Sequence, residues 1–200
     1  AARRAADGRP RDVDVVQAGD AIFCTVGGLG IVSRAAFLAN ALRARPGVVR
    51  SAARAAGPSI YRLTAAAALL SHGGETRTLT LSWLTPAGVR RDETLAVHGL
   101  FVTNQRWCGG GLAIPGGAVD DDGVMELCLV PATTRPRLLD AFTRLSLGLA
   151  VPPSVLRIVP AREAHLVVSD PDGLLGDGEE LASGRVFSLR VRQRALRVVV

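Results

Sequence analysis

The feature of this sequence that most narrows its fold is a strict alternation of polar and apolar side chains. Residues 78–83 read Thr-Leu-Thr-Leu-Ser-Trp, and the same period of two returns over residues 186–192. A period of two is typical of a β-strand that buries one face and exposes the other. Shorter apolar runs bounded by Gly, Pro or Asp predict further strands. These runs cover residues 13–16, 21–26, 93–103, 124–130, 155–159, 165–168 and 196–200.

Three other segments repeat apolar residues at helical spacing. Their expected faces are Ile31, Ala35, Leu38 and Leu42 in the first, Ile60, Leu63, Ala67 and Leu70 in the second, and Leu138, Phe142, Leu145 and Leu149 in the third. The expected boundaries are residues 27–30 and 46–47 for the first, Pro58 and residues 72–74 for the second, and Pro136 and residues 152–153 for the third. Because strands do not alternate regularly with helices, a doubly wound parallel sheet is disfavoured. The sequence predicts a mainly β chain with helices, of the α+β class, built as an antiparallel sandwich or a folded-over sheet.

Composition excludes several classes of protein. With 48% apolar and 21% charged residues, the 200-residue chain can build a sizeable core and is not expected to be disordered. Its longest clean apolar run, residues 65–70, is far shorter than the roughly 18 residues of a membrane-spanning helix. The Arg-rich residues 1–12 lack the apolar stretch of a signal peptide. Cys24, Cys108 and Cys128 are odd in number and form no CxxC, so we expect reduced thiols, a cytoplasmic protein and no zinc site.

The net charge of +6 is unevenly spread along the chain. No acidic residue lies between Asp20 and Glu75, and that interval contains Arg34, Arg43, Arg45, Arg50, Arg54 and Arg62. Such a segment can face anionic lipid or phosphate, and a solvated helical face is an equal alternative. The acidic residues cluster instead in two expected loops, 120–122 and 170–180. Because few aromatic residues accompany the arginines, no nucleic-acid partner is expected.

One early segment resembles a dinucleotide-binding turn. The apolar run 21–26 is followed by Gly28-Leu29-Gly30 and a helix, an order that would place phosphate at a helix N-terminus. Ser33 stands where the third Gly of that motif belongs, and the acid expected about 20 residues later is missing. An NADP-binding oxidoreductase is therefore a weak alternative, and a glycine-mediated turn from strand to helix is the simpler interpretation.

Two later stretches carry a more specific resemblance. The first runs from Asn104 to Glu126 and contains Gly109-Gly110-Gly111, Ile114-Pro115, Ala118 and Asp122-Gly123; the second is Gly176-Asp177-Gly178-Glu179. Together they resemble the C-terminal lobe of the diacylglycerol kinase and sphingosine kinase-like lipid kinases. The sequence departs from that family's pattern with an extra Gly at 116 or 117 and with Val32 in place of an Asp.

The resemblance implies a domain organisation. Residues 13–200 would form a single substrate-side domain, the antiparallel β-sandwich-like C-terminal lobe of a two-domain lipid kinase. Residues 1–12 would continue from a nucleotide-binding lobe, whose Gly-Gly-Asp-Gly-Thr loop this sequence does not contain. The chain alone is therefore expected to lack kinase activity.

The resemblance also implies site residues. Glu179 would accept the proton of the lipid hydroxyl, with Asp177 orienting it or joining a metal–water network. The Asp122 carboxylate and the backbone carbonyls of Val119 and Val124 would hold Mg²⁺, a cation that prefers oxygen ligands. ATP would be the co-substrate, bound mainly by the other lobe. The alternatives are an acidic surface turn at residues 176–179 and a Gly-Asp β-turn at residues 120–123.

By the same resemblance, the function would be ATP- and Mg²⁺-dependent phosphorylation of a lipid hydroxyl. The acceptor would be diacylglycerol-like or a related lipid alcohol. The protein would be cytoplasmic, with peripheral contact to an anionic membrane, and a homodimer stays open. A non-catalytic lipid-binding or interaction module on the same sandwich is the first rival, ahead of the oxidoreductase.

Overall fold

The computed structural model describes residues 8–47, 51, 55, 57, 59–71, 74–108 and 111–199. Over these residues the main element is a nine-stranded sheet in the order β2-β1-β11-β10-β3-β5-β8-β9, with β4 pairing with both β10 and β5. Its neighbouring strands are all antiparallel, as predicted. The strands are β1 (Pro10–Ala18), β2 (Ala21–Phe23), β3 (Val26–Gly30), β4 (Arg77–Leu84), β5 (Arg90–Thr103), β8 (Met125–Pro131), β9 (Arg157–Ala161), β10 (Glu163–Gly176) and β11 (Glu179–Val199), with a separate hairpin of β6 (Trp107–Cys108) and β7 (Leu112–Ala113).

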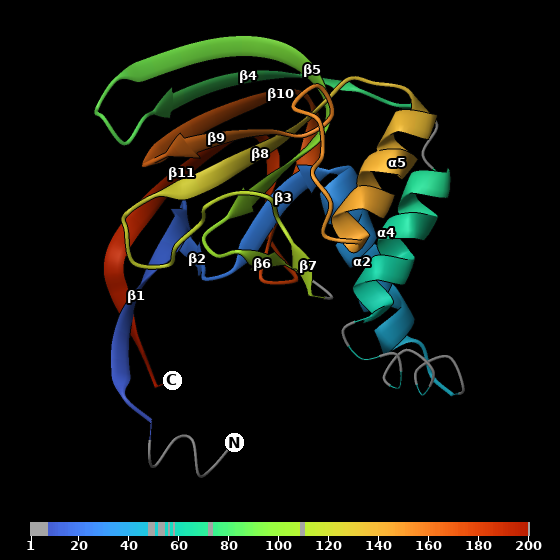
Figure 1. The fold of residues 1–200 in the computed structure, drawn as a ribbon, viewed down its shortest axis with the longest axis horizontal. Helices are drawn as coiled ribbons and strands as arrows, with labels where there is room; N and C mark the ends of the chain where they lie inside the picture. Colours follow the sequence, from blue (N-terminus) through green and yellow to red (C-terminus); the bar gives the residue numbers. More distant parts are fainter. Residues whose placement is uncertain are drawn as a thin grey trace.

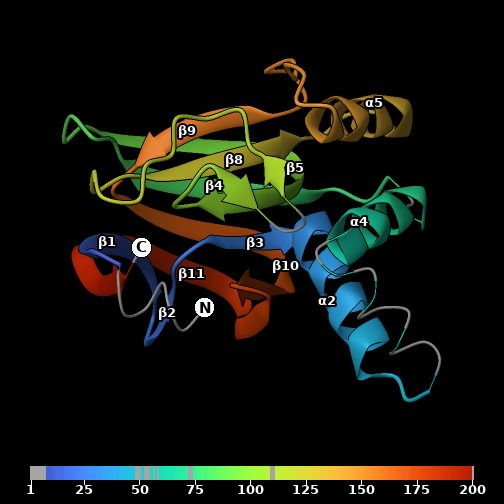
Figure 2. The same cartoon turned by 60° about the horizontal axis from the view of Figure 1, so that its bottom comes forward.

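The sheet folds over because two long strands change partners along their length. β10 pairs first with β4 and then, at Leu175 and Gly176, with β3. β5 likewise pairs with β4 along its first part and with β3 near its end. The layer that contains β8 and β9 consequently lies over the layer that contains β1 and β11 (Figure 2). The predicted mainly β, sandwich-like architecture is confirmed.

The core lies between the two layers and follows the period-two pattern. On β4, Leu79, Leu81 and Trp83 are buried, while the alternating polar residues face outward. On β8, Leu127 and Leu129 point into the same core. Because burying one such side chain contributes roughly 1.5–3 kcal/mol, this alternation fixes which face of each strand turns inward.

Among the described residues, the helices α2 (Ile31–Ala44), α4 (Ser59–Ser71) and α5 (Arg135–Ser146) gather at one end of the sandwich (Figure 1). Their existence and order match the predicted segments. α5 has Pro136 in its first turn, as expected, but it ends before Gly148, whose φ of 70° leaves the helical region. The expected boundaries at Pro58 and at residues 72–73 lie outside the described residues.

The predicted apolar faces of α2 and α4 are only partly right: Ile31 and Ile60 are buried as expected, but Leu38 of α2 and the remaining predicted residues of α4 are exposed. In α2 the buried residues are Ile31, Ser33, Ala36 and Ala39, and in α4 they are Ile60 and Thr64. Leu63 and Leu70 are instead 63% and 60% exposed. The helices are rich in Ala, so close packing uses small side chains, and the larger apolar residues are left to face outward.

The acidic segment 170–180, expected as a loop, is mostly strand. β10 continues to Gly176, and only Asp177 and Gly178 form the turn into β11. Asp172 is accommodated within β10 because its Oδ2 accepts hydrogen bonds from the Gly30 amide and from Arg77 Nη1, each at 2.7 Å. Its negative charge also lies at the start of α2, where the helix dipole favours it.

The early glycines form strand β3, and the last of them, Gly30, is also the N-cap of α2, so the helix begins where expected. A Cβ on Gly28 would lie 2.7 Å from the Leu100 carbonyl oxygen, and one on Gly30 would lie 2.5 Å from the His98 carbonyl oxygen. The glycines therefore let β3 fit tightly against its neighbour. β3 is antiparallel to both β5 and β10, which differs from the parallel unit of a dinucleotide-binding fold.

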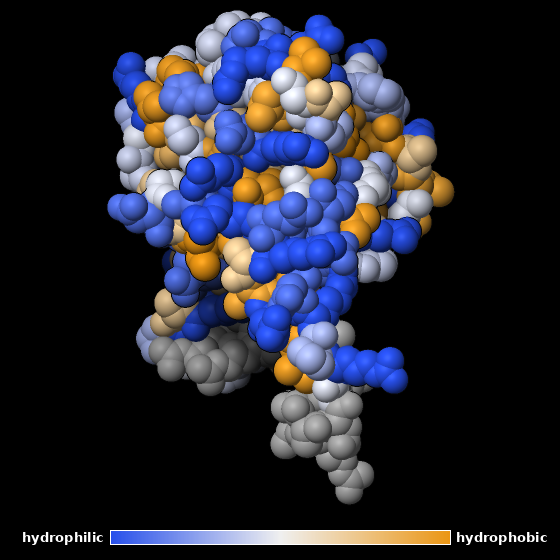
Figure 3. Space-filling model, turned by 90° about the vertical axis from the view of Figure 1, so that its left-hand side faces the viewer, coloured by the Kyte–Doolittle hydropathy of each residue, from blue (hydrophilic) through white to orange (hydrophobic). Residues whose placement is uncertain are grey.

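On the side shown in Figure 3, hydrophilic side chains run down the middle of the face, with apolar ones scattered between them. Among the helices of the described residues, none is both long enough and apolar enough to cross a membrane.

Candidate functional site

The Asp177 carboxylate anchors the turn between β10 and β11. Its Oδ2 accepts a hydrogen bond from the Cys24 amide at 2.7 Å, and its Oδ1 accepts from the Thr25 amide at 2.8 Å and from Thr25 Oγ1 at 2.5 Å. The Asp177 amide in turn donates to the Val26 carbonyl oxygen at 2.9 Å. The carboxylate thus binds the two residues, Cys24 and Thr25, that connect β2 to β3. Asp177 is therefore a structural clamp, because its carboxylate is already occupied by the chain's own donors.

Helices α2 and α4 hold the next residue of the turn. Asn40 of α2 donates its side-chain amide to the Gly178 carbonyl oxygen. The Tyr61 hydroxyl of α4 lies 3.6 Å from the position that a Cβ on Gly178 would occupy. Arg43 donates to that hydroxyl at 2.9 Å and lies over the Tyr61 ring. Gly178 has a φ of 95°, a conformation that favours glycine.

Glu179 begins β11 directly after this turn. Its side chain is exposed, and within the described residues it has no hydrogen-bond or ion-pair partner. The next carboxylate points elsewhere, because Glu180 Oε1 lies 2.9 Å from the position of a Cβ on Gly173. The turn thus presents one uncommitted carboxylate on an otherwise fixed backbone.

An apolar cavity of about 470 Å³ lies beside the turn. Its walls come from α2, α4, α5, β5 and the β6–β7 hairpin, and include Ala35, Ala65, Leu69, Phe101 and Phe142. Val32, at the position where the resembling family has an Asp, is one of the lining residues. Asp177 and Gly178 also line the cavity, and Asp177 is exposed, so the turn lies where the cavity meets solvent. This volume and apolar lining are typical of a small-molecule site.

Asn104 joins the turn region to the acidic loop. It is fully buried, and its side-chain amide donates to the carbonyl oxygens of Asp14 at 2.8 Å and Cys24 at 3.3 Å. Its own backbone amide donates to the Thr25 carbonyl oxygen at 3.0 Å. The Asn104 side chain therefore connects residues 24–25, which bind Asp177, to β1, which supports the acidic loop 120–122.

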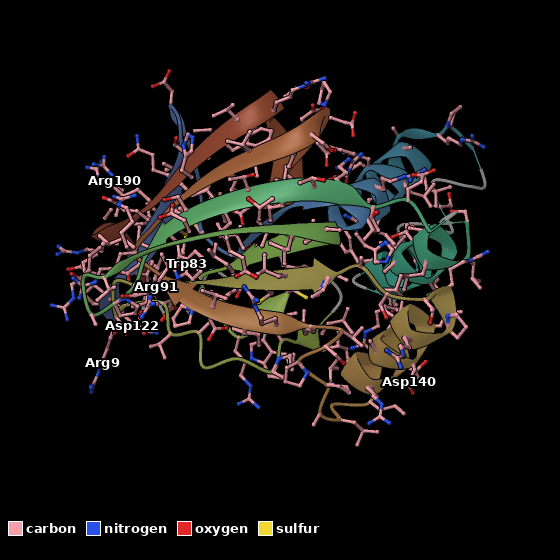
Figure 4. All side chains as sticks on the ribbon, turned by 90° about the horizontal axis from the view of Figure 1, so that it is seen from above. Arg9, Trp83, Arg91, Asp122, Asp140 and Arg190 are labelled. Carbon is pink, nitrogen blue, oxygen red and sulfur yellow. The ribbon has the colours of Figure 1, made fainter. Side chains whose placement is uncertain are left out.

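The acidic loop packs on Asp14, a fully buried carboxylate of β1. Asp14 Oδ2 accepts from the Gly123 amide at 2.6 Å, and its Oδ1 accepts from the Arg194 amide at 2.7 Å. Arg11 forms ion pairs with Asp120 and Asp121. Asp122 has no such ion pair within the described part of the chain; its Oδ1 accepts from the Val124 amide at 2.9 Å. Figure 4 shows Asp122 at the end of the sandwich away from Asp140 of α5.

The predicted magnesium loop has suitable chemistry. Burial raises the pKa of the Asp122 carboxyl, and the nearby Asp14 and Asp121 carboxylates raise it further. A cation would relieve this repulsion, and one carboxylate with the carbonyls of Val119 and Val124 is a hard oxygen set. No cluster of three or more His, Cys, Asp or Glu side chains suited to a metal occurs in the described part of the chain. The magnesium site therefore stays a prediction that depends on backbone oxygens.

The structure adds site residues that sequence reasoning missed. Asp14, Asn40 and Tyr61 had no assigned role, and Asp177 was expected to orient Glu179 or join a metal–water network. Asp14 had a usable signal, since it interrupts the apolar run of Val13, Val15 and Val16. Of the predicted glycine triplet, Gly109 and Gly110 lie outside the described residues, and Gly111 lines the cavity.

Comparison with known families decides the relationship. The model of the YegS C-terminal NAD kinase beta sandwich-like domain matches residues 26–200. The chain belongs to this family. This match to the YegS C-terminal domain confirms the predicted resemblance to the lipid kinases, which residues 104–126 and 176–179 carry.

Solved structures show the same fold. Two of them come from Bacillus anthracis strain Sterne and bear the name diacylglycerol kinase, one of them provisionally. The first has a TM-score of 0.72 and 18% identity, over 98% of this chain and 60% of that chain. The second has a TM-score of 0.64 and 18% identity, over 94% of this chain and 56% of that chain. The YegS C-terminal domain thus spans less than two thirds of each. A search of curated proteins gave no match.

The clamp predicts the effect of Asp177→Asn. Asn also tolerates the φ of 48° at this position, so the backbone conformation is retained. Its amide group, however, would face one of the donors at residues 24–25. We expect the free energy of unfolding to fall by about 1–3 kcal/mol, measured by urea denaturation.

Asp170→Asn is the matched control, because Asp170 accepts only from its neighbour Ser169 and is exposed. Its effect should stay within about 0.5 kcal/mol. Hydrogen exchange at residues 24–26 should accelerate in Asp177→Asn alone. Equal stability and exchange in the two variants would contradict the clamp.

The acidic loop predicts opposite effects of Asp122→Asn with and without metal. Because the pKa of Asp122 is raised on folding, the folded state loses stability as pH rises through the carboxyl titration range. In chelator at neutral pH, Asp122→Asn should therefore melt at the same or a higher temperature than the parent. With Mg²⁺ at about a hundredfold excess over Kd, the parent should gain up to about 2.7 kcal/mol and the variant almost none. If Mg²⁺ does not change the melting temperature of the parent, the predicted magnesium site is wrong.

Proposed function

We propose that this domain binds a lipid alcohol in the apolar cavity and that Glu179 accepts the proton of its hydroxyl during phosphorylation. The observation that carries the proposal is the position of the Asp-Gly-Glu turn. Two of its residues line an apolar cavity of about 470 Å³, and the third has a free carboxylate. Family membership and the names of the structural neighbours agree with a lipid-kinase role.

The chemistry requires few groups from this domain. The lipid oxygen would attack the γ-phosphorus of ATP while its proton passes to the Glu179 carboxylate. The bond between that phosphorus and the bridging oxygen would break, and ADP would leave. Phosphoryl transfer depends mainly on positioning and charge stabilisation, so a fixed turn beside the bound lipid is the main contribution expected of these residues.

Other parts of the reaction would come from outside the cavity. ATP would be held mainly by a nucleotide-binding lobe, and Mg²⁺ bound at the Asp122 loop would order that loop. Asn104 would transmit this order to the turn, because it bonds to both Asp14 and Cys24. The lipid would arrive from the anionic surface of a cytoplasmic membrane. The proposed acceptor is diacylglycerol-like or a related lipid alcohol, in keeping with the names of the structural neighbours.

The proposal predicts the effect of Glu179→Gln in the protein that joins this domain to its nucleotide-binding lobe. Gln keeps the size of the side chain but cannot accept the hydroxyl proton. We expect the rate at saturating ATP and diacylglycerol to fall by about 10²- to 10⁴-fold. Because Glu179 is exposed and unpartnered, the melting temperature should not change.

Glu180→Gln is the matched control, with the same charge change one position along β11. Its side chain lies over Gly173, so the rate should change by no more than a few-fold. If the two variants keep the parent's rate, Glu179 is not the proton acceptor. If the unsubstituted protein with both lobes binds diacylglycerol but transfers no phosphate to it, the domain is a non-catalytic lipid-binding module.

A further inference from the structure

Helix α4 exposes apolar side chains that its spacing predicted to be buried. Leu63 and Leu70 are 63% and 60% exposed, and Ala67 between them is exposed as well. These three residues lie at spacings of four and three and so share one face of the helix. The helix has 13 residues, and Arg62 is its sole charged residue. We call Leu63, Ala67 and Leu70 the outer face of α4.

The inner face of the same helix lines the apolar cavity. Tyr61, Ala65 and Leu69 are among the lining residues. One helix therefore separates the cavity from the surroundings and is apolar on both sides. A helix that is apolar all round is normally buried, so its exposed face indicates a missing apolar partner.

The charge around α4 indicates the chemistry of that partner. The sequence from residue 21 to residue 74 contains arginines and no acidic residue, and α4 lies within it. Arg62 lies on α4 itself, and Arg135 of α5 donates a hydrogen bond to the Leu70 carbonyl oxygen, so basic groups lie at this helix. Apolar side chains bordered by basic ones are the pattern of a helix that lies in an anionic membrane interface.

We propose that the outer face of α4 docks on an anionic lipid bilayer, with Leu63 and Leu70 inserted among the acyl chains. This inference rests on the proposed function for its choice of partner, because a cavity that takes a lipid alcohol must be filled from a membrane. It adds the surface that makes contact: the helix whose inner face lines the cavity is the one that touches the bilayer.

The test is a vesicle sedimentation assay with the chain and with the double variant Leu63→Gln/Leu70→Gln. The vesicles contain phosphatidylcholine and phosphatidylglycerol in equal parts, or phosphatidylcholine alone. We expect the parent to bind the mixed vesicles, to bind pure phosphatidylcholine more weakly, and to lose binding as salt is raised. The double variant should partition into mixed vesicles at least about tenfold less, because each leucine gives up its burial in the acyl region.

Ile22→Gln/Val186→Gln is the matched control, since these apolar residues of β2 and β11 are 57% and 56% exposed. It should bind vesicles as the parent does, and thermal melting should show that both double variants fold. The proposal would be overturned if Leu63→Gln/Leu70→Gln bound the mixed vesicles as strongly as the parent does. It would also be overturned if the parent itself did not bind anionic vesicles. A parent dimer that Leu63→Gln/Leu70→Gln dissociates in sedimentation velocity would also overturn it, because a second copy would then cover the face.

The kinase assay separates this inference from the function on which it rests. The double variant Leu63→Gln/Leu70→Gln is made in the protein that contains both lobes. With diacylglycerol in detergent micelles, this variant should phosphorylate at the parent's rate. With diacylglycerol in anionic vesicles, its rate should fall to a small fraction of the parent's. An unchanged rate in Glu179→Gln would defeat the proton acceptor and leave vesicle binding through α4 standing.

Discussion

The site depends on one carboxylate, that of Asp177. It accepts hydrogen bonds from the backbone amides of Cys24 and Thr25 and from the Thr25 hydroxyl, across more than 150 residues of sequence. Bonds to a charged acceptor are about twice as strong as those between neutral groups. Without them the turn would keep only backbone bonds, such as that from the Asp177 amide to Val26, and the Asn40 contact, so the start of β11 at Glu179 would be held less firmly.

Two features of the fold place this turn beside the apolar cavity. The change of partners along β5 and β10 folds the sheet over, and β3 fits between them because its glycines have no side chains. The helices pack at that end of the sandwich and enclose the apolar cavity. Asn104 ties residues 24–25 to β1, on which the acidic loop rests, so the predicted metal loop and the turn are parts of one bonded unit.

The sequence predicted most of the strands, the antiparallel class and the order of the helices, because period-two and helical spacing are local signals. It was wrong for residues 21–26, which form the separate strands β2 and β3, and for residues 186–192 and 196–200, which belong to the single strand β11. It was right for Ile31 and Ile60 but failed for the rest of the α4 face and for Leu38 of α2, since Ala-rich helices carry little contrast between sides. It also failed for residues 170–176, where Asp172 lies in a strand because the Gly30 amide and Arg77 satisfy it. Such partners, like those of Asp14 and Asn104, lie far away in sequence and leave no local pattern. Glu179 and the ligands of the Asp122 loop remain predictions from the family resemblance.

The central claim is that the cavity beside the Asp-Gly-Glu turn holds a lipid alcohol. Photo-crosslinking with a diacylglycerol that carries a diazirine on one acyl chain tests it most directly, with the modified residues mapped by mass spectrometry. The account predicts saturable labelling of the cavity walls, such as Ala65, Leu69 and Phe142, that unlabelled diacylglycerol abolishes. Labelling confined to outward-facing residues, or labelling that unlabelled diacylglycerol does not reduce, would contradict it.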